Sequence, residues 1–161
     1  MNTDFVVLAA GEGKRMLGAA PKVLLPVAGK PMAQHALDTI SGIEKSRAIL
    51  VLGNQAKEVK KALNANKNTK TITQRKQLGT AHAVKMALPQ LRPGSVMVVL
   101  YGDVPLVESR SLKKLIKSAE KGSLAILTFI KENPQGYGRI VSGSRNQVRA
   151  IIEEKDATKE Q

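Results

Sequence analysis

The chain has 161 residues, of which 42% are hydrophobic and 24% are charged, as expected for one globular domain with a sizeable core. It contains no cysteine, which excludes disulfides, thiol catalysis and cysteine-bound metals. The formal net charge is +13, so a basic nucleic-acid-associated protein has to be considered.

Aromatic residues and long apolar stretches are both scarce. The aromatic residues are Phe5, Tyr101, Phe129 and Tyr137. Proteins that bind single-stranded nucleic acid stack bases on such side chains, so we expect no nucleic-acid partner and keep that function as a distant alternative. Residues 96–100 and 124–130, the longest apolar stretches, are too short to span a bilayer, and no signal-peptide pattern opens the chain. We therefore expect a cytoplasmic protein without a membrane partner.

Short apolar runs alternate with helical patterns along the chain. The runs predict strands at 5–8, 48–52, 70–73, 96–100 and 124–130, most of them continuous, as in strands covered on both faces. Helices are predicted at about 31–41, 55–64, 79–88 and 110–120. This alternation predicts an α/β fold with a mainly parallel sheet, followed by a β-hairpin of 139–141 and 148–152 that flanks the pocket.

The first strand runs into a glycine-rich, basic turn that contains Gly11, Gly13 and Arg15, with Lys22 shortly after it. Glycines let backbone N–H groups approach a phosphate, and the cations add positive charge at the same place. The turn is neither a P-loop nor a dinucleotide fingerprint, because Lys-Arg follows Gly13 and Met16 takes the place of a third glycine. Taken alone, it is also typical of a tight strand-to-helix turn.

Two more loops follow predicted strands, at 74–80 and 101–103. Ligands of parallel sheets bind beyond the carboxyl ends of the strands, so these loops and the first turn are expected to form one site. Asp103 offers a hard oxygen ligand for Mg²⁺, or is a turn or capping residue. Gln74 has the donors and the acceptor that suit uracil, whereas Thr80 either contacts the nucleotide or is only a helix N-cap.

Five ordered strings resemble the sugar-1-phosphate nucleotidyltransferase family. They are 8–16 with its continuation to 32, 74–83, 101–106, 136–140 and 153–158. The resemblance is closest to the N-acetylglucosamine-1-phosphate uridyltransferase domains that precede an acetyltransferase β-helix in bifunctional bacterial enzymes. It implies a Rossmann-like three-layer sandwich in a single domain, with residues 1–106 as the nucleotide-binding half and 107–161 as the beginning of a sugar-binding half.

The resemblance also implies an activity and a set of site residues. The activity is transfer of a uridylyl group from UTP to N-acetylglucosamine 1-phosphate with Mg²⁺, giving UDP-N-acetylglucosamine and pyrophosphate for cell-envelope (peptidoglycan) synthesis. The implied nucleotide-binding residues are Leu8, Ala9, Ala10, Gly11, Gly13, Lys22, Gln74, Gly79 and Thr80. The implied sugar-phosphate residues are Tyr101, Gly102, Asp103, Gly138 and Glu153. Arg15, Lys22 and Asp103 would be catalytic, and Asp103 would be the metal ligand.

Several alternatives remain open at this stage. The resembled domain continues with strands that supply an Asn to the sugar and a second metal ligand, so this chain is expected to be truncated. A nucleotide-binding or UDP-sugar-binding module without turnover is therefore the main alternative. Glu153 could instead pair with Lys155 at the surface. His35 and His82 are predicted to be structural or solvent-facing, because nucleotidyl transfer depends on positioning and charge neutralisation more than on a base. Uracil against thymine, the sugar and the oligomeric state are not decided by the sequence.

Overall fold

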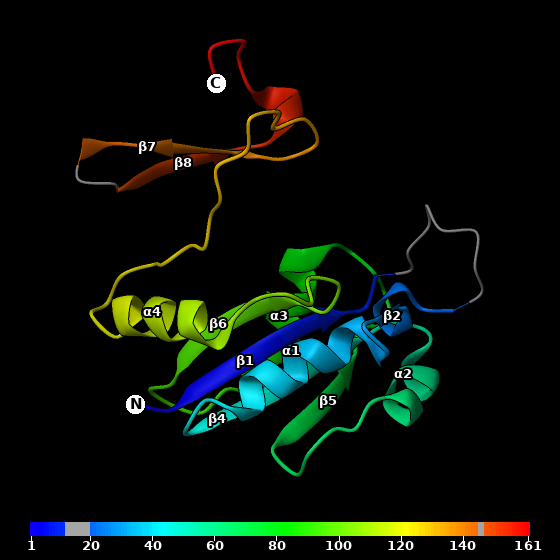
Figure 1. Ribbon diagram of the computed structural model, residues 1–161. Coiled ribbons are helices and arrows are strands. Elements are labelled where there is room, and N and C mark those ends of the chain that lie inside the picture. The colour runs from blue at the N-terminus through cyan, green and yellow to red at the C-terminus, as the bar shows by residue number, and fades with distance from the viewer. Residues whose placement is uncertain (12–19, 145–146) are drawn as a thin grey trace. The chain divides into compact units, whose positions relative to one another are not determined.

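The computed structural model describes residues 1–11, 20–144 and 147–161, and the chain divides into two compact units, Met1–Ala125 and Ile126–Gln161. The first unit contains a four-stranded parallel sheet (Figure 1). In chain order its strands are β1 (Thr3–Ala9), β4 (Ser46–Leu52), β5 (Thr69–Thr73) and β6 (Val96–Tyr101). Their order across the sheet is β5-β4-β1-β6. The chain adds β4 and β5 on one side of β1 and then returns to place β6 on the other side, so the strand order reverses between β1 and β6.

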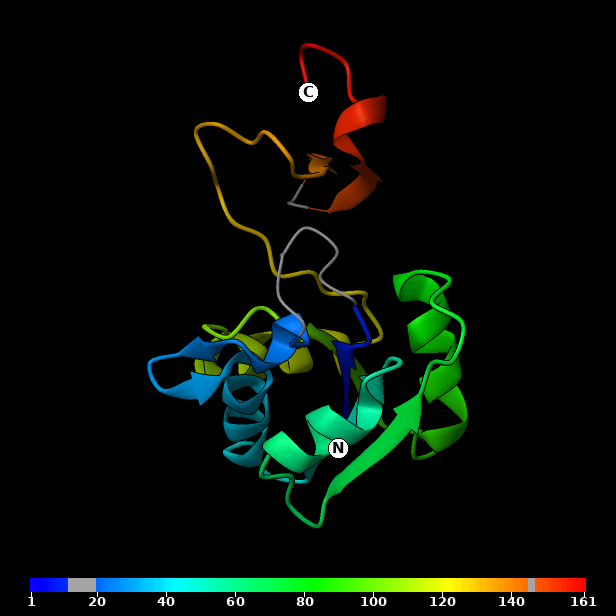
Figure 2. The same ribbon diagram turned by 90° about the vertical axis from the view of Figure 1, so that its right-hand side faces the viewer.

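Helices cover both faces of this sheet. The helices are α1 (Met32–Ser41), α2 (Ala56–Ala62), α3 (Thr80–Ala87) and α4 (Ser109–Ala119). The first, second and fourth pack on one face and α3 packs on the other; Figure 2 shows α1 and α3 on opposite sides of β1. The predicted three-layer α/β fold is therefore confirmed. No helix in the described parts of the chain is long and apolar enough to cross a membrane.

The core is organised around β1, all seven residues of which are buried. Phe5 and Val7 pack with α1 and α4, whereas Val6 and Leu8 pack with α3 on the opposite face. Side chains of a strand alternate between its two faces, so a strand covered on both faces has to be continuously apolar. This is the physical origin of the apolar run at 5–8.

A small two-stranded hairpin precedes α1 and was not predicted. It pairs β2 (Pro26–Val27) with β3 (Lys30–Pro31) through a turn in which Ala28 has a φ of +46°. Strands of two residues that both contain proline carry no apolar periodicity, so the sequence gives no signal for them. His35 of α1 holds the hairpin, since its Nε2 lies 2.8 Å from the Val27 carbonyl oxygen. This contact confirms a structural role for that histidine.

The second unit contains the predicted hairpin, formed by the antiparallel strands β7 (Arg139–Ser142) and β8 (Val148–Ile152). Arg139 also lies 3.8 Å from Glu154 in the following short 3-10 helix (Glu154–Asp156). Phe129 and Tyr137 make an edge-to-face ring contact with centroids 5.2 Å apart.

The strand predicted at 124–130 is wrong. These residues are in no strand, and Leu124 is 88% and Phe129 66% exposed. An apolar run becomes a strand only where another strand pairs with its backbone, and residues 124–130 pair with no strand among the described residues.

A buried ion-pair network joins β1, β4 and the segment before β6 at the end of the sheet where these strands begin. The carboxylate of Asp4 is fully buried and accepts hydrogen bonds from the guanidinium groups of Arg47 at 2.9 Å and Arg92 at 2.8 Å. The Arg92 backbone N–H at 2.6 Å and the Ser95 hydroxyl at 2.9 Å also donate to it. Burial alone would raise the pKa of Asp4, but these hydrogen bonds outweigh it and hold the pKa below its ordinary value.

We expect the substitution Asp4→Asn to lower the free energy of unfolding by about 3 kcal/mol, because it leaves two guanidinium groups beside a neutral amide in the protein interior. Urea denaturation at pH 7 measures this. The control Ser95→Ala removes one neutral hydrogen-bond donor and should cost only about 1 kcal/mol. Equal losses in the two variants would contradict this account of the network.

The pH dependence of stability follows from the lowered pKa of Asp4. Its stabilising contribution is complete above the pKa of the unfolded chain, about 4, and is lost as the pH falls through the lower pKa of the folded state. The wild-type protein should therefore lose more stability than Asp4→Asn between about pH 5 and pH 2. Denaturation curves over that range test this, and parallel curves for the two proteins would count against it.

Candidate functional site

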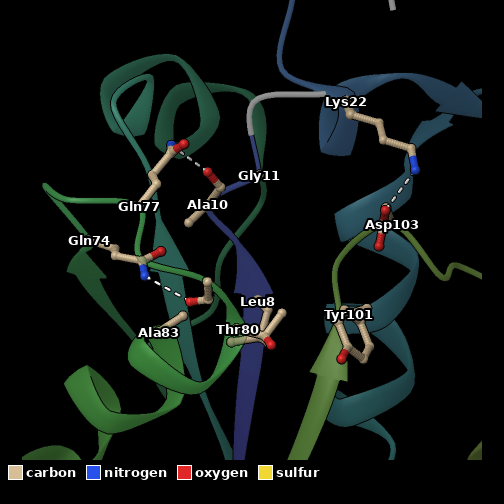
Figure 3. A pocket seen from close by; sticks show the side chains of 11 residues that line it. Leu8, Ala10, Gly11, Lys22, Gln74, Gln77, Thr80, Ala83, Tyr101 and Asp103 are labelled. Carbon is tan, nitrogen blue, oxygen red and sulfur yellow. Dashed lines mark hydrogen bonds and ion pairs between the residues drawn. The ribbon is translucent and has the colours of Figure 1, made fainter. Parts of the chain in front are cut away.

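A cavity of about 360 Å³ lies at the carboxyl ends of β1 and β6, where the strand order reverses. Leu8 and Tyr101, which are register partners on these two strands, both line it. Its lining residues are Leu8, Ala10, Gly11, Lys22, Gln74, Gln77, Gly79, Thr80, Ala83, Tyr101 and Asp103 (Figure 3). Open parallel sheets bind ligands at such a reversal, so the cavity is the candidate site.

Most of the sequence-predicted site residues of the first unit line this one cavity. The exceptions are Ala9 and Gly102, which are buried next to each other and do not line it. Gly138 and Glu153 belong to the second unit, and their sugar contacts stay predictions. Gly13 and Arg15 lie outside the described residues.

The ends of β1 and β6 are fastened together at Gly102. Its N–H donates to the Leu8 carbonyl oxygen at 2.9 Å, and a Cβ at this position would lie 3.1 Å from that oxygen and 3.3 Å from Ala9 Cβ. The glycine therefore allows the turn after β6 to approach β1 closely, and this turn carries Asp103 to the cavity.

Lys22 and Asp103 form an ion pair at the cavity wall. Lys22 begins the 3-10 turn Lys22–Leu24, directly after Pro21, and its Nζ lies 2.7 Å from Asp103 Oδ2. Both side chains are partly exposed, at 41% and 32%. Asp103 does not cap α4, whose N-cap is Glu108. A lysine and a carboxylate at one wall can bind phosphate oxygens and a divalent cation, respectively.

Gln74 forms the opposite wall and is almost fully buried, with 2% of its surface exposed. Its backbone N–H donates to the Leu52 carbonyl oxygen at 2.7 Å. Its amide nitrogen lies 3.1 Å from the Gly79 carbonyl oxygen and 2.8 Å from His82 Nδ1. Thr80 is the first residue of α3 and Gly79 is its N-cap, so the alternative in which Thr80 is merely an N-cap is wrong.

Gln77 and Gly53 are two residues of the site whose importance the sequence did not show. Gln77 Nε2 donates to the Ala10 carbonyl oxygen at 2.7 Å, which fixes the backbone that leaves β1. A Cβ on Gly53 would lie 2.6 Å from both of these atoms, so only glycine leaves room for the bond. Gln77 lies within the string 74–83 and could have been selected there, whereas nothing near Gly53 in the sequence indicates a close approach.

The described residues offer a divalent cation one carboxylate at the cavity. No group of three or more His, Cys, Asp or Glu side chains that could hold a metal occurs among residues 1–11, 20–144 and 147–161. Mg²⁺ is commonly held by one or two carboxylates together with substrate phosphates and water. Asp103 fits this mode of binding.

The fold and the cavity indicate the class of protein to which the chain belongs. A parallel α/β sheet with glycine-bearing loops, a lysine and a carboxylate at its strand reversal is a nucleotide-binding arrangement. The family model of the MobA-like NTP transferase domain matches residues 5–159, and the chain therefore belongs to this family of nucleotidyltransferase domains.

Individual relatives agree with this assignment. The chain is 46% identical to the bifunctional protein GlmU of Burkholderia lata over 158 residues, which make up 98% of this chain and 35% of that protein. The chain thus spans about a third of the length of the curated relatives that it matches.

Solved structures show the same fold. A manganese complex of Rv0371c from Mycobacterium tuberculosis is 27% identical with a TM-score of 0.61, over 75% of this chain and 61% of that one. UDP-glucose pyrophosphorylase complexed with UDP-glucose has a TM-score of 0.73 at 17% identity, over 95% of this chain and 69% of that one, and shows the likeness of fold alone.

The close approach at Gly53 gives a direct test of the β1 loop. We expect Gly53→Ala to break the bond between Gln77 and Ala10 and to weaken nucleoside-triphosphate binding by about tenfold or more, because the new methyl group occupies the space of that bond. Calorimetric titration with UTP measures the effect. Gly42→Ala is the matched control, since a Cβ there meets only the Thr39 carbonyl oxygen at an ordinary 3.7 Å. Unchanged UTP affinity in a folded Gly53→Ala protein would show that the bond does not shape the site.

Proposed function

We propose that the chain transfers a uridylyl group from UTP to N-acetylglucosamine 1-phosphate, forming UDP-N-acetylglucosamine and pyrophosphate. The observation that carries this proposal is the division of the cavity, with the Gln74 amide on one side and the Lys22–Asp103 pair on the other (Figure 3). UTP has a polar base at one end and phosphates at the other, and each end would meet the matching side chains. The motifs that resemble N-acetylglucosamine-1-phosphate uridyltransferase domains, together with the similarity to GlmU, support the choice of substrates and a role in cell-envelope synthesis in the cytoplasm.

The proposed reaction is a single in-line displacement. An oxygen of the sugar phosphate attacks the α-phosphorus of UTP and forms the new P–O bond. The bond from that phosphorus to the bridging oxygen breaks, and its electron pair leaves with pyrophosphate. The attacking phosphate is already ionised at neutral pH, so no general base is required. The contacts of His35 with Val27 and of His82 with Gln74 agree with this.

Lys22 would act by charge. Its ammonium group would stabilise the phosphate oxygens on which negative charge develops, and such placed charges often make the largest single contribution to catalysis. Asp103 would hold Mg²⁺, which would supply further charge neutralisation at the phosphates. The manganese complex of Rv0371c supports a divalent cation in this family. Arg15 remains a predicted second cation.

The ion pair between Lys22 and Asp103 is compatible with both roles. A pair with both members partly exposed contributes little to the stability of the fold, about 0 to 1 kcal/mol. Lys22 can therefore leave Asp103 for a phosphate oxygen, and Asp103 can leave Lys22 for a cation, at a small cost in free energy. The pair keeps the two charges balanced at the cavity until the ligands arrive.

A nucleotide-binding module without turnover is the second candidate. It is favoured by the lining of the cavity within the first unit, where Asp103 is the one carboxylate that the described residues offer to a cation. Pyrophosphate release with UTP, Mg²⁺ and N-acetylglucosamine 1-phosphate, measured beside UTP titration on the same sample, separates the two candidates. Turnover supports the transferase, whereas UTP binding without turnover supports the module.

Two substitutions test the assigned roles. We expect Lys22→Ala to weaken UTP binding by about tenfold or more, because a charge-assisted hydrogen bond is lost. We expect Asp103→Asn to lower Mg²⁺-dependent turnover by about a hundredfold or more, the usual effect of removing a group that organises charge in the transition state. Titration and pyrophosphate release are the measurements.

The chain contains a matched control pair outside the cavity. Lys30 and Asp38 form an exposed ion pair at 2.8 Å, so Lys30→Ala and Asp38→Asn make the same chemical changes without touching the site. Both control variants should bind and turn over like the wild type. Unchanged UTP binding in a folded Lys22→Ala protein would overturn the transferase and the nucleotide-binding module together.

A further inference from the structure

The side-chain amide of Gln74 lies between two hydrogen-bonding groups of α3 and its N-cap. Its nitrogen is 3.1 Å from the Gly79 carbonyl oxygen and 2.8 Å from Nδ1 of His82. The two atoms of a glutamine amide differ in what they can do, since the nitrogen donates two hydrogen bonds and the oxygen only accepts. The surroundings of Gln74 therefore decide which atom is left for a ligand.

The Gly79 carbonyl oxygen determines the orientation of the amide. A backbone carbonyl can only accept, so the Gln74 atom beside it has to be the nitrogen. The same nitrogen faces His82 Nδ1, so Nδ1 has to accept as well, and the proton of the neutral imidazole is on Nε2. Both amide hydrogens are thus taken by protein acceptors.

The amide oxygen is what remains. The hydrogen bonds of the Gln74 side chain to described residues all involve its nitrogen, so Oε1 is left without a protein partner. Gln74 is only 2% exposed, and it lines the cavity. Figure 3 shows the amide nitrogen turned to the start of α3 and the oxygen turned away from it. No buried side-chain nitrogen or oxygen of the described residues lacks a partner, so this oxygen is accessible from the cavity. A base that displaces water from it has to bring a donor in exchange, because an acceptor left unpaired beneath a bound ligand is costly.

We propose that His82 holds the Gln74 amide in the orientation that the Gly79 carbonyl dictates, and so helps this wall to select a nucleobase with a ring N–H over one with a bare ring nitrogen. His82 is in this respect a positioning residue and a determinant of specificity. The inference rests on the proposed function, because it assumes that the base of a nucleotide lies at Gln74.

The chemistry of the pyrimidines shows what this polarity discriminates. Uracil and thymine carry a hydrogen on N3, which Oε1 of Gln74 can accept. Cytosine has a lone pair on N3, so two acceptors would face each other in a buried site. A site with a fixed, buried polar group rejects a ligand that leaves the group unpaired more strongly than a flexible or apolar site does.

Titration of the full 161-residue chain with UTP and CTP in magnesium-containing buffer tests the proposal. We expect the wild type to bind UTP at least about tenfold more tightly than CTP, the equivalent of one hydrogen bond left unmade in a buried site. His82→Ala should reduce this UTP-to-CTP ratio severalfold, because one of the two acceptors that orient the amide is gone. His82→Asn should largely restore it, since an Asn carbonyl can accept near the position of Nδ1.

His35→Ala is the matched control. It makes the same change at the other histidine, whose partner is the Val27 carbonyl oxygen outside the cavity, and should leave the UTP-to-CTP ratio unchanged. Thermal unfolding of each variant reports whether it is folded. If His82→Ala does not fold, wild-type titration with N3-methyl-UTP still decides, because the methyl group replaces the hydrogen that Oε1 would accept. This analogue should bind at least about tenfold more weakly than UTP.

The outcomes separate this inference from the proposed function. The role of His82 would be overturned if a folded His82→Ala protein kept the full preference for UTP over CTP, or if UTP and N3-methyl-UTP bound equally. Either result would leave UTP binding in place. Failure of the wild type to bind UTP at all would overturn the proposed function and this inference with it. A ratio lost in His82→Ala and recovered in His82→Asn supports the proposal.

Discussion

The central position of β1 is the constraint on which the rest of the first unit depends. Strands β4 and β6 occupy both of its edges, helices cover both of its faces, and none of its residues is exposed. A strand in that position has to be apolar or bring partners for every polar group that it carries. Its one charged residue, Asp4, is accordingly surrounded by two arginines and a serine from β4 and the segment before β6. The burial of β1 and the Asp4 network are therefore parts of one arrangement.

The same strand also builds the site at its other end. The Leu8 carbonyl oxygen receives the Gly102 N–H, and the Ala10 carbonyl oxygen receives the Gln77 side chain. These are backbone acceptors at the point where β1 leaves its neighbours, and each fastens a different loop. Each carbonyl group that no longer bonds to a neighbouring strand needs another donor, and the loops that supply these donors are thereby held in position.

The predictable part of this protein is the part encoded in short-range patterns. Continuous apolar runs located three strands of the parallel sheet, and the short run at 70–73, in which only Ile72 is apolar, located the fourth. The rule for parallel sheets brought the loops at 74–80 and 101–103 to one edge. The run at 124–130 has equal apolarity but forms no strand, because composition says nothing about whether a partner strand is available.

Contacts in the site between residues far apart in the chain could not be predicted from the sequence. Lys22 and Asp103 are 81 positions apart, and their contact depends on a turn after Pro21 and on the close approach at Gly102. Gly53 is required by atoms of Ala10 and Gln77 that no local pattern connects with it. Gln74 could be selected as a base-reading residue from its chemistry, but the direction in which its amide points could not.

The two sides of the cavity differ in how freely they can rearrange, and this difference suits a nucleotide. The Lys22–Asp103 pair is partly exposed, so water screens both charges and either partner can be exchanged for a ligand atom at small cost. The Gln74 amide is buried and both of its hydrogens are taken, so turning it over would set its oxygen against the Gly79 carbonyl. An adaptable wall of charge is appropriate for a flexible, multiply charged phosphate chain, whereas a fixed polar wall is appropriate for a rigid planar base. The Gly79 carbonyl dictates the orientation of the Gln74 amide and His82 helps to hold it. A backbone group therefore contributes to the choice of ligand as directly as a side chain does.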